Sequence, residues 1–236
     1  MYTRRRILGA AAALSASGLT PAYAKDQCTI ITPERQKATT PAAALKSLKD
    51  GNDRFVAGKM INCDLRQQVK ATARGQYPIA AVVGCIDSRV PPEMVFDQYL
   101  GDIFAARIAG NFVNTDIIGS LEFSTKVAGA KVIVVLGHTG CGAIRGAIDN
   151  VKLGNLTAML ANIRPAVDKV ATGRKEKDCT STNREFVQAV AEKNTELAAQ
   201  DLVEKSTVLR SMVDAGEVKI VRGMHDIGTG RVTFSE

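Results

Sequence analysis

Four short apolar runs constrain the fold of this 236-residue chain more than any other feature. They span residues 79–83, 103–109, 131–136 and 218–221, and the third is almost entirely β-branched. Strands that are buried on both faces have such continuous apolar sequences, and the stretches between the runs are long enough to hold crossover helices. The sequence therefore predicts an α/β fold with a mainly parallel central sheet and flanking helices.

Helical spacing and turn residues complete the predicted order of elements. Apolar residues after Pro41 predict a helix that is interrupted near Gly51, and residues 183–217 predict one or two helices before the fourth strand. A glycine-containing turn then leads into residues 231–234, which we expect to form a short antiparallel edge strand. The chain shows no internal repeat and no second domain.

Residues 1–24 have the pattern of an export signal. Three arginines at positions 4–6 precede an apolar stretch from Ile7 to Leu19, and small residues at 22 and 24 mark a cleavage site. Because the stretch is too short to span a bilayer comfortably, we expect cleavage to leave no membrane anchor. The arginines resemble a twin-arginine signal, which predicts a periplasmic protein. After the signal, residues 25–40 read as a polar, extended or mobile arm and residues 41–236 as one folded domain.

The charge of the chain gives no reason to expect a nucleic-acid partner. The formal net charge is +7, but removal of residues 1–24 leaves 28 basic against 24 acidic side chains. Binding to nucleic acid requires clustered cations, and this modest excess is spread along the sequence.

Two of the predicted strands are each followed at once by potential metal ligands. Cys85 follows the first strand, and His138 and Cys141 follow the third. The carboxyl ends of parallel strands share one edge of the sheet, so the 53 positions between Cys85 and His138 do not keep these side chains apart. Two thiolates and one imidazole are a common zinc set, and three protein ligands leave a fourth position for water.

Each of these residues also has a simpler explanation on its own. A cysteine at the end of a buried strand is often a small apolar filler, and Cys141 of an exported protein can be half of a disulfide. The metal-site interpretation rests on the combination, because one cysteine lies three residues after a histidine and the other lies two before an aspartate.

At these positions the sequence resembles the β-carbonic anhydrase family. Cys85-Ile86-Asp87-Ser88-Arg89 is similar to the first motif of that family, and His138-Thr139-Gly140-Cys141-Gly142 is similar to the second. The likeness extends to residues 51–55, 75–78, 109–111, 119–122 and 226–232, so that it covers nearly all of the chain after residue 41.

The resemblance implies a reaction and a set of site residues. It implies one zinc ion per chain, held by Cys85, His138 and Cys141, and the reversible hydration of carbon dioxide to bicarbonate by a zinc-bound hydroxide. Asp87 would orient the hydroxide, or close the site by binding zinc itself, and Arg89 would hold the Asp87 carboxylate. The implied substrate-binding residues are Gln76, Phe104, Ala109, Phe123 and Gly142. Without the resemblance, Asp87 and Arg89 would read as a surface salt bridge and the others as turn or core residues.

Some positions differ from the family pattern or fall outside it. Phe123 stands where many relatives carry tyrosine, so the hydroxyl group of that position is missing. Cys28, Cys63 and Cys179 remain after the zinc ligands are assigned, and at most one internal disulfide can form among them. We expect His225, the second of two histidines, to be structural.

The resemblance further implies a homodimer or a larger homo-oligomer, in which an N-terminal helical arm wraps a second subunit. Two rival functions stay open at the level of sequence. The same site could hydrolyse carbon disulfide or another linear heterocumulene, or Asp87 could close the coordination sphere permanently in a zinc-storing protein.

Overall fold

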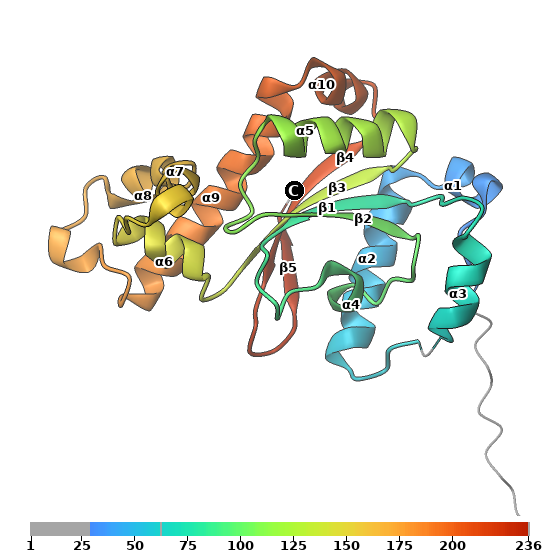
Figure 1. Ribbon diagram of the computed structural model, residues 1–236, viewed down its shortest axis with the longest axis horizontal. Coiled ribbons are helices and arrows are strands. Elements are labelled where there is room, and N and C mark those ends of the chain that lie inside the picture. The colour runs from blue at the N-terminus through green and yellow to red at the C-terminus, as the bar shows by residue number, and fades with distance from the viewer. Residues whose placement is uncertain (1–28, 62, 236) are drawn as a thin grey trace, which may run out of the picture.

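Five strands of the described residues form one sheet across the centre of the molecule, with helices on both faces (Figure 1). The structure is a computed structural model that describes residues 29–61 and 63–235. The strands are β1 (Ala80–Gly84), β2 (Ile103–Arg107), β3 (Val132–His138), β4 (Lys219–His225) and β5 (Val232–Ser235). Their order is β2-β1-β3-β4-β5, in which only the β4–β5 pair is antiparallel. The predicted α/β class, the parallel centre and the antiparallel edge are confirmed.

The two central strands show why their sequences are continuously apolar. Every residue of β1 and β3 is buried. Val132, Val134 and Leu136 of β3 face one core cluster, which also contains Leu48 of helix α2 (Pro41–Val56), whereas Ile133 and Val135 face the cluster on the other side of the sheet. Since both faces are covered, neither set of alternating positions can be polar.

The helices cover the two faces of the sheet unequally (Figure 1). Helices α2 and α4 lie on one face, α5 and α10 lie on the other, and α6 to α8 form a separate lobe against α9. The bounds are α1 Pro33–Ala38, α2 Pro41–Val56, α3 Leu65–Thr72, α4 Pro92–Val95, α5 Thr115–Glu122, α6 Gly142–Ile148, α7 Gly154–Ala161, α8 Arg164–Ala171, α9 Arg184–Lys205 and α10 Thr207–Asp214. A π-helical turn, η1 (Phe123–Val127), continues α5, and a 3₁₀ turn, η2 (Glu176–Asp178), precedes α9.

The predicted interruption at Gly51 is wrong, because α2 runs unbroken from Pro41 to Val56. Gly51 is buried in this helix, and a Cβ atom there would overlap the carbonyl oxygen of Phe96, the residue that ends α4. The glycine therefore serves close contact between two chain segments and does not break the helix.

The second half of the polar arm is more regular than expected. Residues 33–38 form α1, whose N-cap Thr32 accepts a hydrogen bond from the backbone of Arg35. Gln36 of this helix donates to the carbonyls of Pro78 and Ala128 at 2.6 and 2.8 Å, which precede the neighbouring strands β1 and β3. These two bonds tie the helix to the domain.

Residues 183–217, for which the sequence predicts one or two helices, form the two helices α9 and α10. Ser206 separates α9 from α10 and caps the second helix, since its hydroxyl accepts from the backbone N–H of Leu209 at 3.0 Å.

The export signal at 1–24 and Cys28 lie outside the described residues. Within the described ranges, no helix combines the length and the apolar character that crossing a membrane requires.

Candidate metal centre

Three potential metal ligands meet at the carboxyl edge of the sheet. Cys85 directly follows β1, His138 is the last residue of β3, and Cys141 caps the start of α6 after a turn in which Gly140 has a φ of +65°. All three side chains are buried, and their ligand atoms lie within 4.8 Å of one another. The structure thus brings together the three residues that the sequence singled out as ligands.

The donor set fits zinc. The Nδ1 atom of His138 lies 3.0 Å from the carbonyl oxygen of Thr139, and because a carbonyl can only accept, Nδ1 carries the proton. The lone pair is then on Nε2, which is buried and has no hydrogen-bond partner among the described residues. The two sulfur atoms are 3.9 Å apart, close to the ~3.8 Å that tetrahedral bonds of about 2.3 Å to one zinc ion impose.

The two thiols perturb one another. Their mutual hydrogen bond lowers the pKa of Cys85, whereas the same bond and burial raise the pKa of Cys141. Two neighbouring thiolates repel each other, so both sulfurs are ionised together only when a cation neutralises them. Binding of a divalent ion therefore releases a proton from this pair.

A carboxylate and a guanidinium group border the three ligands. Arg89 donates to Asp87 from Nε at 2.9 Å and from Nη2 at 2.7 Å, and its backbone N–H donates at 3.0 Å. The side-chain bonds from Arg89 hold the pKa of Asp87 well below its usual range. Oδ2 of Asp87 lies 4.0 Å from Nε2 of His138. An ionised acceptor is thus held beside the ligands but outside their cluster.

Comparisons with known proteins assign this constellation to a family. Residues 80–232 match the family model described as carbonic anhydrase. Carbonic anhydrase 2 of Mycobacterium tuberculosis is 35% identical over 203 residues, which cover 84% of this chain and 94% of that protein. The chain belongs to the β-class carbonic anhydrase family.

Solved structures of β-carbonic anhydrases have the same fold. The β-carbonic anhydrase CafA of Aspergillus fumigatus aligns with a TM-score of 0.64 at 26% identity, over 83% of this chain and 90% of that chain. One of two tetrameric β-carbonic anhydrases of Sordaria macrospora aligns with a TM-score of 0.61 at 24% identity, over 82% and 95%. The enzyme is a lyase that interconverts carbon dioxide and bicarbonate, and Cys85, His138 and Cys141 are the group that holds one zinc per chain.

Sequence reasoning missed two groups that hold the metal-binding loop of this carbonic anhydrase. Arg107, at the end of β2, donates to the carbonyl of Cys85 at 2.9 Å and to that of Asp87 at 2.7 Å. The backbone N–H of Gly110 donates to the sulfur of Cys85 at 3.3 Å. The available signal was the charge of Arg107 inside an apolar run, which indicates a side chain with a specific partner.

The predicted substrate-binding residues fall into two groups. Ala109 precedes Gly110, and Gly142 follows Cys141 at the start of α6, so both lie beside the ligands. Phe104 pairs instead with Ala81, four residues before Cys85, which places it roughly 13 Å away along the strand.

Phe104 and Phe123 contact each other edge to face, with ring centroids 6.2 Å apart, and line a hollow of about 730 Å³ beside α5. Gln76 is exposed and precedes β1, so it lies toward the amino-terminal ends of the strands, whereas the ligands lie at their carboxyl ends. Within one chain these three residues do not join the metal ligands.

His225 ends β4 beside His138, its register partner in β3. It is 2% exposed, and burial, together with the neighbouring His138, lowers its pKa. Both ring nitrogens are buried without a hydrogen-bond partner among the described residues, and the ring lies outside the ligand cluster, so the structural role expected for His225 stays a prediction.

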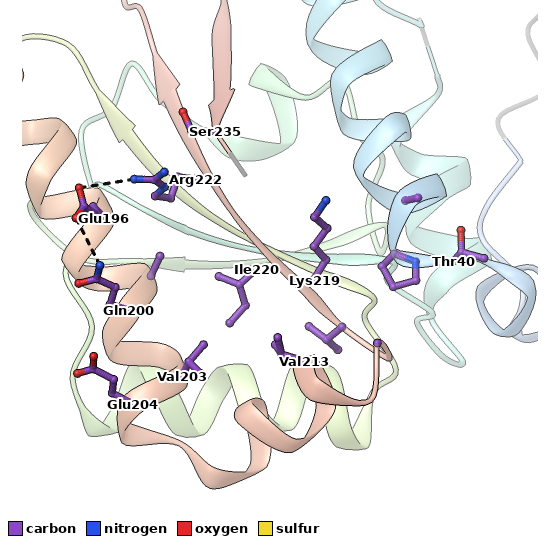
Figure 2. A pocket seen from close by; sticks show the side chains of 15 residues that line it. Thr40, Glu196, Gln200, Val203, Glu204, Val213, Lys219, Ile220, Arg222 and Ser235 are labelled. Atoms are coloured by element: carbon purple, nitrogen blue, oxygen red, sulfur yellow. Dashed lines mark hydrogen bonds and ion pairs between the residues drawn. The ribbon is translucent and has the colours of Figure 1, made fainter.

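A separate groove of about 1000 Å³ runs along the first half of β4, between α9, α10 and the start of α2 (Figure 2). Val203, Val213 and Ile220 point into it, and Glu196 approaches Arg222 at 3.8 Å and Gln200 at 3.5 Å on its rim. None of the metal ligands lines this groove, so the carbonic anhydrase site lies elsewhere.

Proposed function

We propose that Asp87 and Arg89 direct the reacting water in this carbonic anhydrase and keep the fourth zinc position open. The observation that carries the proposal is the two-pronged contact from Arg89 to Asp87, with the carboxylate 4.0 Å from His138 Nε2. Bound zinc would supply a water molecule that ionises near neutral pH and can attack carbon dioxide.

Asp87 and Arg89 would act on that water through different properties. Asp87 remains ionised because of Arg89, so its carboxylate can accept a hydrogen bond and turn a lone pair of the water toward the substrate. Arg89 occupies both carboxylate oxygens with a planar fork, which keeps Asp87 from becoming a fourth ligand.

Stopped-flow hydration of carbon dioxide by zinc-analysed protein tests this proposal. We expect wild type to be active and Asp87→Asn to keep its zinc while losing activity about 10- to 100-fold, as outer-sphere partners of metal sites commonly do. An inactive wild-type protein with full zinc would instead favour permanent closure by Asp87. Hydrolysis of carbon disulfide without hydration of carbon dioxide would reassign the substrate.

We propose further that the enzyme works as a homodimer or a larger homo-oligomer in which each copy completes the site of another. Phe123 is 52% exposed next to Phe104, and β2 is an edge strand of the described sheet. Gln76 is at the same edge, with its Cβ near Gly101 just before β2. Exposed aromatic and amide groups on one edge suit a surface that another subunit covers. The tetrameric state of the Sordaria macrospora relatives supports such assembly.

Export to the periplasm is the third part of the proposal. It is supported by the twin-arginine pattern at residues 4–6 and by a disulfide at Cys63, since disulfides persist mainly in oxidising compartments. Changing Arg4 and Arg5 to lysine should trap the precursor in the cytoplasm. Unchanged recovery from the periplasm would reject this route.

A further inference from the structure

The segment that follows β2 makes an unusual turn beside the metal ligands. Gly110 has a φ of +82°, and a Cβ atom at this position would collide with the side chain of Ile163. Asn111 has a φ of +43°, a conformation that few residues other than glycine adopt readily. The turn brings the N–H of Gly110 to 3.3 Å from the sulfur of Cys85, 25 residues earlier in the chain.

Two successive residues of α9 hold this turn. Asn194 is 3% exposed, and its Nδ2 donates to the carbonyl oxygen of Gly110 at 2.7 Å. Asn111 donates from its own side chain to the hydroxyl of Thr195 at 3.3 Å. Asparagine is a poor helix former, and burying its amide is unfavourable without a partner. The position of Asn194 inside a 22-residue helix therefore indicates a specific role.

We propose that Asn194 is a positioning residue of the zinc centre, which fixes the Gly110 peptide so that its N–H stays directed at the Cys85 sulfur. Asn194 holds the carbonyl of Gly110, which belongs to the peptide group after the Gly110 α-carbon, and the N–H that meets the sulfur belongs to the peptide group before it. With the carbonyl held, the N–H can turn away from the sulfur only through rotation within Gly110 itself. The strained conformation of the turn makes such rotation favourable once the clamp is removed.

The contact has a direct consequence for the metal. A hydrogen bond to a thiolate withdraws electron density from the sulfur and makes it a weaker donor, which leaves the bound ion a stronger Lewis acid. Asn194 would thus affect the reaction without touching a ligand, substrate or water. This inference rests on the zinc site of the family and is independent of the roles proposed for Asp87 and Arg89.

The test compares two buried asparagines that both donate to backbone carbonyls. Asn194→Leu keeps the branched shape of the side chain and removes the donor. Asn52→Leu is the matched control, because Asn52 is 2% exposed and its side chain bonds to backbone groups of Val95, Gly230 and Val232, none of which is a metal ligand. Full-length proteins are loaded with cobalt(II) for absorption spectra and with zinc for affinity and kinetics.

For Asn194→Leu we expect the sulfur-to-cobalt charge-transfer band to move to longer wavelength, with kcat/KM about tenfold lower for the zinc form. Asn52→Leu should lose thermal stability and keep the wild-type band. If Asn194→Leu does not fold, the same measurement on Asn194→Ser decides, because a serine side chain is too short to reach the Gly110 carbonyl.

An unchanged band and unchanged zinc affinity in the folded Asn194 variant would overturn the proposal and leave Asn194 a purely structural residue. A wild-type protein that binds neither metal would refute the zinc centre itself, and this result is distinguishable because it needs no variant.

Discussion

Asp87 and Arg89 are two positions apart in sequence, and their backbone arrangement already favours their contact. The N–H of Arg89 donates to Oδ1 of Asp87, so the carboxylate is bound from both the main chain and the side chain of one residue. This local turn makes the pair predictable from the motif alone. The partners of Arg107 and Asn194 were not predictable, because each side chain bonds to backbone atoms of a loop that is distant in sequence.

Replacing Arg89 by alanine should separate metal binding from catalysis. Without the guanidinium group, Asp87 is freer to swing onto the cation and displace the reacting water. We expect full zinc content and a hydration rate at least about tenfold lower. Arg231→Ala is the control, since Arg231 forms an exposed 3.1 Å pair with Asp53, which is not a site residue. Near-normal turnover of Arg89→Ala would reduce the Asp87–Arg89 contact to a structural salt bridge.

The burial of Asp102 predicts that the free energy of unfolding depends on pH. It is 6% exposed, and burial raises its pKa, although the backbone N–H of Tyr99 and the charge of Arg35 oppose the shift. The folded protein therefore binds this proton more tightly than the unfolded chain does, so the stability contribution of Asp102 decreases as pH rises from about 4 toward neutrality.

Asp102→Asn removes that titration and keeps an oxygen that can accept from Tyr99 at the 3.1 Å position. The variant should be more stable than wild type at pH 7, and its advantage should shrink as pH falls toward 4. Urea unfolding of both proteins across this range measures the difference. A variant that is less stable by the same amount at every pH would contradict the assignment.

At the scale of elements, burial on both faces explains which parts of the fold were visible in the sequence. All residues of β1 and β3 are buried, so their sequences contain no polar alternation and could be recognised as central strands. The role of Gly51 could not be predicted from the local sequence. A glycine within a helical pattern suggests a break, whereas Gly51 allows close contact with Phe96, which is 45 positions away in the chain.

Gly51→Ala should destabilise the protein even though alanine is the better helix former. The added methyl group would overlap the Phe96 carbonyl, which must move together with α4, and overpacking of this kind costs about 3 kcal/mol. Ser47→Ala on the same helix is the control and should be neutral or slightly stabilising. Equal unfolding midpoints for Gly51→Ala and wild type would show that α2 and α4 can separate without loss.

At the scale of the whole molecule, the zinc ligands lie where the sheet meets the helical lobe. Cys85 and Cys141 belong to the cluster formed with α6, α8 and α9, while the strands that carry the site extend into the clusters on the two faces of the sheet. This part of the site could be predicted, because parallel strands bring their carboxyl ends together. The positions of Gln76, Phe104 and Phe123 could not be predicted in this way, because within a single chain they do not lie beside the zinc ligands.

A heterodimer of two inactive copies provides the decisive test of shared sites. One copy carries Asp87→Asn, which impairs the zinc side of its site, and the other carries Gln76→Leu, which impairs the surface offered to a partner. Co-expression with two different tags and tandem purification isolate the mixed species. If sites are shared, one site combines both defects and the other combines none, so the heterodimer should regain about half of the wild-type rate, as two-fold symmetry requires. If each site is built from one chain, every site keeps one defect, and the heterodimer should be no more active than the mean of its parents.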